Sequence, residues 1–145
     1  MISYALAERL HGHLALLGLA VLLHPVITLR VRRGVSKRMQ LSADLGALLL
    51  VLPYIGGLLL YPAYRANVKK VLLLDQPAVA AGFESKEHLA AMAVALAIGG
   101  ALTLRASGTD AGRRTARALL FAGWVCGFAA AILGLWVASS AHPAP

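Results

Sequence analysis

The sequence predicts an all-α membrane protein, a bundle of four transmembrane helices formed by a single domain over residues 1–145. The chain is 59% hydrophobic, against roughly 45–50% apolar residues in soluble domains, and its mean hydropathy is +0.74. The apolar residues fall into four runs, each long enough to cross a bilayer core about 30 Å thick. The basic residues gather in two of the links between these runs.

The four predicted spans cover residues 4–29, 41–62, 78–104 and 115–140. They are apolar around the whole helix, which is typical of membrane spans; the alternative, the core of a soluble bundle, usually shows one apolar stripe. No basic region precedes the first run and no small-residue cleavage site ends it. We therefore expect a retained helix and not a signal peptide.

The distribution of basic residues predicts the orientation. The chain has a net charge of +8, and nine of its 14 lysines and arginines lie in the first and third links. The positive-inside rule places these links in the cytoplasm and both termini outside, on the periplasmic side of a prokaryotic inner membrane. We interpret the basic residues as topology signals and contacts with anionic lipid, with no nucleic-acid partner. The nine residues are Arg30, Arg32, Arg33, Lys37, Arg38, Arg105, Arg113, Arg114 and Arg117.

Prolines and glycines mark the elements along the chain. Pro25 lies in the first span, and Pro53 with Gly56-Gly57 interrupts the second, where we expect a kink. Residues 67–75 predict a short amphipathic helix on the outer membrane surface. The fourth span carries small residues that allow helices or a flat ligand to approach the backbone closely. These are Gly123, Gly127 and Gly134 among alanines.

Three of the five histidines lie in the first span, at positions 11, 13 and 24. An imidazole inside a membrane is costly unless it meets a partner or water. His13 and His24 are eleven residues apart, so they share one helical face to within about 20°. We expect this face to point into the bundle, whereas His11 points roughly the opposite way. His142 lies in the short tail, where we expect it to be solvated.

A fourth histidine suggests a haem site in the outer half. His88 begins the apolar part of the third span, at a depth comparable with that of His11 and His13. One histidine from each of two helices matches bis-imidazole ligation of haem iron, with His88 and His13, or alternatively His11, as ligands. Arg65 and Lys69, with Lys70 and Lys86, lie on the same side and suit the propionates. The alternative is that the outer histidines face water or headgroups.

Two further constellations involve carboxylates. Glu8 with His11, and Glu84 with His88, share helical faces and suit a bound metal ion. The other two spans offer no glutamate at that depth, and Glu84 otherwise belongs to a solvated helix start. In the inner half, Asp44 and His24 each lie about one turn inside the membrane. We expect a hydrogen bond between them that holds the first two spans together, in preference to a proton relay.

The function classes that remain are few. Four spans with internal histidines resemble the membrane b-type cytochromes in general, which implies haem b and electron transfer in or near a respiratory or photosynthetic chain. The alternatives are a non-catalytic accessory subunit that packs against other membrane subunits, and a membrane metal-binding protein. The sequence contains no phosphate loop, nucleophile elbow, CxxCH haem attachment or paired-carboxylate motif, so it predicts no independent catalytic activity.

Overall fold

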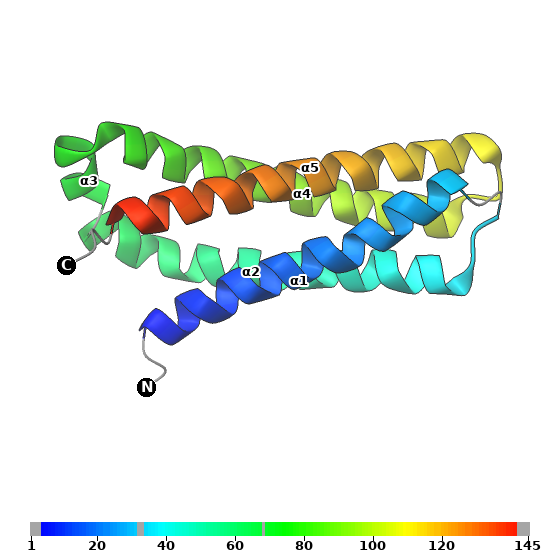
Figure 1. Cartoon of the computed structure of the whole chain (residues 1–145), viewed down its shortest axis with the longest axis horizontal. Coiled ribbons are helices and arrows are strands. Elements are labelled where there is room, and N and C mark those ends of the chain that lie inside the picture. The colour runs from blue at the N-terminus through cyan, green and yellow to red at the C-terminus, as the bar shows by residue number, and fades with distance from the viewer. Residues whose placement is uncertain (1–3, 32–33, 68, 142–145) are drawn as a thin grey trace.

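The protein is described by a computed structural model that covers residues 4–31, 34–67 and 69–141, and within these residues it contains helices and no strand. Four long helices lie side by side and a short fifth one caps an end of the bundle (Figure 1). The helices are α1 (Tyr4–Val31), α2 (Lys37–Asn67), α3 (Lys69–Asp75), α4 (Pro77–Ala106) and α5 (Asp110–Ala141).

Two predictions are confirmed: the described residues form an all-helical fold, and four of its helices are long and apolar enough to span a membrane. Their apolar stretches run from 22 to 31 residues with hydropathies of 1.8 to 2.2, and about 20 residues suffice for a crossing. Between 22% and 28% of each stretch is buried inside the bundle. Large apolar side chains therefore cover the outside, as a lipid-facing surface requires.

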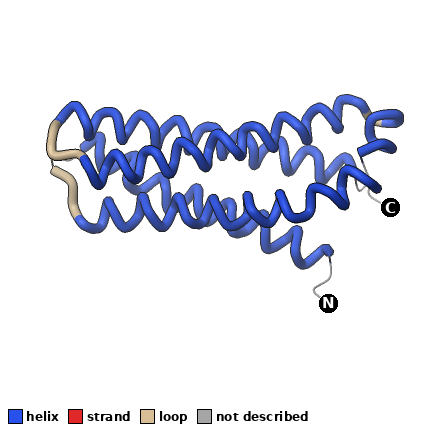
Figure 2. Tube along the Cα trace, turned by 180° about the vertical axis from the view of Figure 1, so that it is seen from behind, coloured by secondary structure: helices blue, strands red, loops and turns tan. Residues whose placement is uncertain are grey.

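The two ends of the bundle differ. At one end lie the short connections 34–36 and 107–109, drawn as loops in Figure 2; we call it the link end. At the other end lie α3 and both ends of the described chain, and we call it the α3 end (Figure 1). Seven of the nine basic residues of the two links lie at the link end, and Arg32 and Arg33 fall outside the described residues.

The order of the helices around the bundle follows from their contacts. α1 packs against α2 and α5, and α4 packs against the same two helices. α1 and α4 therefore occupy diagonal corners of the bundle. The closest packing occurs within the hairpins α1–α2 and α4–α5.

Glycines set the close approach inside each hairpin. A Cβ atom placed on Gly46 of α2 would lie 3.0 Å from the Cα of Leu22 in α1. One placed on Gly123 of α5 would lie 3.1 Å from the carbonyl oxygen of Ala93 in α4. We expected the glycines of the fourth span to leave room for a flat ligand, but neighbouring groups occupy most of that space. Gly123 and Gly127 contact neighbouring helices, and Gly134 lies against Lys86.

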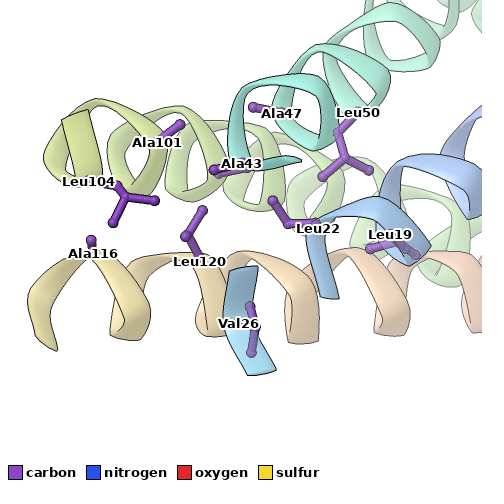
Figure 3. Close-up of a cluster of buried hydrophobic side chains, with 11 residues drawn as sticks. Leu19, Leu22, Val26, Ala43, Ala47, Leu50, Ala101, Leu104, Ala116 and Leu120 are labelled. Atoms are coloured by element: carbon purple, nitrogen blue, oxygen red, sulfur yellow. The ribbon is translucent and has the colours of Figure 1, made fainter. Parts of the chain in front are cut away.

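The main core lies toward the link end and draws on all four long helices (Figure 3). It consists of small and branched side chains, and no polar or charged side chain in the described part of the chain is fully buried. Its members are Leu19, Leu22, Val26, Ala43, Ala47, Leu50, Ala97, Ala101, Leu104, Ala116 and Leu120. A second cluster at the α3 end joins Leu72 of α3 to Val79 and Ala80 of α4.

The first turns of α1 diverge from the other helices at the α3 end (Figures 1 and 2). The helices are also longer than the predicted spans: α2, for example, continues past Pro62 to Asn67. Pro25 and Pro53 lie inside α1 and α2, which are helical on both sides of them. A proline removes one backbone donor, but the rest of the helical hydrogen bonds persist where no water competes for them. The short helix predicted over 67–75 is present as α3.

Candidate functional site

The contacts around Gly127 place α1 and α4 on a common depth scale. A Cβ atom on Gly127 would lie 2.7 Å from Leu19 Cδ2 and 3.5 Å from Ala93 Cβ, so these two residues lie at one level. His13 precedes Leu19 by six residues and His88 precedes Ala93 by five, which corresponds to about 9 Å and about 7.5 Å along the helices. His13 and His88 therefore lie at nearly the same depth.

The two histidines do not converge, however. Both side chains are exposed, and they belong to helices at diagonal corners of the bundle. His24 shares the exposed face of His13, so the two lie on one side of α1 as predicted, but this face points away from the bundle and not into it. A haem held between α1 and α4 by His13 and His88 does not fit this arrangement, since both imidazoles of such a site must meet one iron atom.

His11 lies in a different environment. Its ring is half-buried, and its Cε1 atom would lie 3.5 Å from a Cβ atom on Gly57 of α2. His11 therefore packs toward α2, while His88 lies on α4. The structure does not bring this alternative ligand near His88 either.

The His88 ring has a defined orientation. Its Nδ1 atom lies 2.8 Å from the carbonyl oxygen of Glu84, one turn earlier in α4. A carbonyl oxygen only accepts hydrogen bonds, so Nδ1 is the donor in this contact, and Nε2 is the ring nitrogen that takes no part in it. Histidines that ligate metals are commonly held in this way by a hydrogen bond from the other ring nitrogen.

Two of the four basic residues expected to pair with propionates, Lys69 and Lys86, already have carboxylate partners, and the Lys70 side chain lies outside the described part. Lys69 of α3 forms an ion pair with Glu84 of α4, and the hydrogen bond to this carboxylate raises the pKa of Lys69 above its ordinary value. Lys86 Nζ lies 3.1 Å from Glu87 Oε1 and 4.6 Å from the centre of the Phe83 ring. Arg65 is exposed at the end of α2. The α3 end is thus close to electrical balance.

The expected metal ligands are not gathered into one site. Within the described residues, no three side chains of His, Cys, Asp or Glu lie close enough together to hold an ion. The carboxylate of Glu84 bonds to Lys69, while His88 contacts the Glu84 carbonyl. The Glu8 side chain and His142 lie outside the described part, so the Glu8–His11 pair stays a prediction.

Aromatic rings join α2, α4 and α5 at the α3 end of the bundle. The Tyr64 and Phe83 rings stack with centroids 3.9 Å apart and planes inclined by 18°. Trp136 of α5 covers Gly82 of α4, where a Cβ atom would lie 2.3 Å from its ring. The Tyr64 hydroxyl is buried and finds no hydrogen-bond partner among the described residues. These contacts give the α3 end a structural role.

Asp44 has a different partner from the one predicted. Its carboxylate accepts hydrogen bonds from Arg105 at 3.0, 3.2 and 2.7 Å, which link α2 to α4. The predicted depth match with His24 is present, because Gly46 lies level with Leu22 and both His24 and Asp44 lie two residues nearer the link end. Asp44 points toward α4, however, and His24 is exposed on α1. The clamp therefore joins the second and third spans.

Sequence reasoning missed two interhelical contacts. The sequence analysis gives Arg105 a role in topology and in contacts with anionic lipid, although its charge lies at the same end of the bundle as Asp44 and is opposite in sign. Trp124 of α5 donates a hydrogen bond of 3.1 Å from Nε1 to the carbonyl oxygen of Leu19 in α1, and its ring stacks on Phe128. The sequence offered no signal for the second contact, because a tryptophan in an apolar run has many possible neighbours.

A double-mutant cycle on Asp44→Ala and Arg105→Ala tests the clamp, measured as unfolding of the detergent-solubilised protein. Each single variant should lose stability, and the double variant should lose less than the sum, because either change already breaks the ion pair. The matched cycle of Asp44→Ala with His24→Ala should be additive. Additive losses in the first cycle, or coupling in the second, would contradict this assignment.

Compared with protein-family models, with curated protein sequences and with solved structures, the chain gives no match.

Proposed function

We propose that the chain is an integral membrane subunit that associates with other transmembrane helices through an exposed face of α1. This is the accessory-subunit alternative considered above. The observation that carries it is the polar character of one exposed stripe within an apolar surface. We call this the α1 stripe, formed by Leu10, His13, Leu17, Ala20 and His24, all exposed in the isolated chain.

The α1 stripe has the spacing and composition of a helix-packing seam. Its residues follow one another at intervals of three and four, which keeps them on one face of a helix. His24 lies well inside the apolar stretch Leu10–Val31, where an imidazole that faces lipid is costly. Ala20 lies between the histidines and permits close approach of a second helix, to which histidines can hydrogen-bond.

A second exposed stripe provides the contrast. On α5 the same spacing gives Val125, Phe128, Ile132 and Leu135, all exposed and all apolar. Such a face suits lipid chains without further partners. The two stripes differ in chemistry and not in exposure, which favours a protein partner for α1 and lipid for α5.

The proposed orientation places both termini outside and the link end in the cytoplasm of a prokaryotic plasma membrane. Nine basic residues in the two links, against five elsewhere, support it. A reporter enzyme that is active only outside the cytoplasm, fused after Pro145, should be active. The same reporter inserted after Gly108 should be silent, and the reverse pattern would overturn the orientation.

Association through the α1 stripe can be measured by light scattering after mild-detergent extraction from membranes of the native host. The wild-type chain should elute in an assembly with more protein mass than one chain. His24→Leu should shift it toward the single chain, because the polar contact to the partner helix is lost, and the matched change Val125→Leu on α5 should not. A wild-type protein that elutes as a single chain, or an assembly unaffected by His24→Leu, would contradict the proposal.

Haem b is the second candidate, favoured by the equal depth of His13 and His88 and by the fixed Nδ1 proton of His88. Because these rings point away from the bundle at diagonal corners, ligation would join two polypeptides and not two helices of one chain. Bound haem would supply one-electron transfer.

A visible spectrum of protein expressed with ample haem tests this candidate. We expect sharp α and β bands on reduction, lost in His88→Ala and in His13→Ala, and kept in His11→Ala because His11 packs toward α2. Colourless wild-type protein would exclude haem and leave the accessory-subunit proposal standing.

A further inference from the structure

Two adjoining cavities lie between α1 and α5 at the link end, and they differ in chemistry. One has a volume of about 270 Å³ and is lined mainly by charged side chains. The other has a volume of about 580 Å³ and is lined mainly by apolar side chains. They share Arg30, Val31 and Arg117, so together they form one continuous site.

The charged cavity has a strong excess of positive charge. Arg30 at the end of α1 and Arg113, Arg114 and Arg117 in the first turns of α5 line it, with Asp110 as the one acidic residue. Asp110 forms an ion pair with Arg113. Within the described part of the chain, Arg30, Arg114 and Arg117 have no carboxylate partner. The positive charge of three guanidinium groups around one cavity is therefore not balanced by a carboxylate. Guanidinium groups form strong, often bidentate hydrogen bonds with phosphate.

The apolar cavity continues from these arginines toward the middle of the bundle. It is lined along α1 from Val31 back to Leu23 and along α5 from Arg117 to Phe121. Eight residues of α1 correspond to about 12 Å, which is most of the roughly 15 Å of hydrocarbon in one leaflet. A charged region at the link end that continues into an open apolar groove of this length along α1 matches a phospholipid.

We propose that this site binds one anionic phospholipid from the leaflet at the link end. Its phosphate lies against Arg30, Arg114 and Arg117, and one acyl chain lies along Leu23, Ile27 and Phe121. The proposal rests on the membrane placement proposed above, but not on the α1 stripe or on haem. It goes beyond a general attraction of basic links to an anionic surface, because it requires these arginines and this channel together.

The position of the site gives the lipid a structural task. The α1–α5 contact is less extensive than the contacts inside the hairpins. A phosphate bound by arginines from both helices would bridge them and offset the repulsion among their charges. The lipid would thus close the seam between the two hairpins at the link end.

Native mass spectrometry of the full chain in mild detergent tests the proposal, with phosphatidylglycerol and phosphatidylcholine titrated separately. The first phosphatidylglycerol should bind roughly tenfold more tightly than phosphatidylcholine, because an anionic headgroup meets three arginines. Arg30→Gln with Arg117→Gln should lose this preference. The matched double variant Lys37→Gln with Arg38→Gln removes the same charge at the same end of the bundle and should keep it.

Two further arms separate this site from other occupants. Dihexanoyl phosphatidylglycerol should bind much more weakly than the long-chain lipid, since it cannot fill the apolar channel, and inorganic phosphate should not displace the long-chain lipid. Equal binding of both chain lengths, displacement by phosphate, or equal losses in the two double variants would overturn the proposal. The proposal would also be overturned if a second copy of the chain occupied this site and excluded the lipid. His24→Leu should bind phosphatidylglycerol like the wild type, so failure of the α1 stripe is distinguishable from failure of this site.

Discussion

Close contact between helix backbones at small residues is the interaction on which the rest of the bundle depends. Lipid tails are as apolar as leucine, so burial of apolar surface does not by itself drive these helices together, and packing must do so. Gly46 lets α2 approach the backbone of Leu22, and Gly123 lets α5 approach Ala93 and Ala97. These contacts determine which face of each helix is buried, and therefore which side chains are exposed.

The charged residues are arranged so that the apolar middle of the bundle carries few of them. At the α3 end, Lys69 pairs with Glu84 across two helices. Toward the link end, Arg105 and Asp44 connect α2 and α4. Neither pair lies within the α1–α2 or the α4–α5 hairpin, because one joins α3 to α4 and the other joins α2 to α4. The pairs therefore fix the relative positions of the hairpins and α3, and they do not determine how each hairpin forms. Among the arginines between α1 and α5, Arg113 pairs with Asp110, and the ion pairs of the described residues give the others no acidic partner.

The histidines acquire a different meaning once the packing is known. In the sequence, His11, His13 and His88 belong to the outer half of the predicted spans and His24 to the inner half. Histidines at matched depth on two helices are what a haem site inside a bundle needs. In the bundle, His13, His24 and His88 lie on outward faces and His11 packs beside Gly57. His13, His24 and His88 therefore do not face one another across the interior of the bundle, as the ligands of an internal haem must.

The sequence by itself determined the all-helical class, four helices that are long and apolar enough to span a membrane, and a short helix predicted over 67–75 and observed over Lys69–Asp75. Each residue advances a helix by 1.5 Å, so the sequence also predicted that His24 lies level with Asp44 and that His88 lies at a depth comparable with that of His11 and His13. The direction in which each side chain points was not predictable. The four spans are apolar on all sides, so no amphipathic pattern marks an inner face. The inner face of each helix is determined by tertiary contacts such as those of Gly18, Gly46, Gly100 and Gly123. With this packing His24 lies on the outer surface and Asp44 pairs with Arg105.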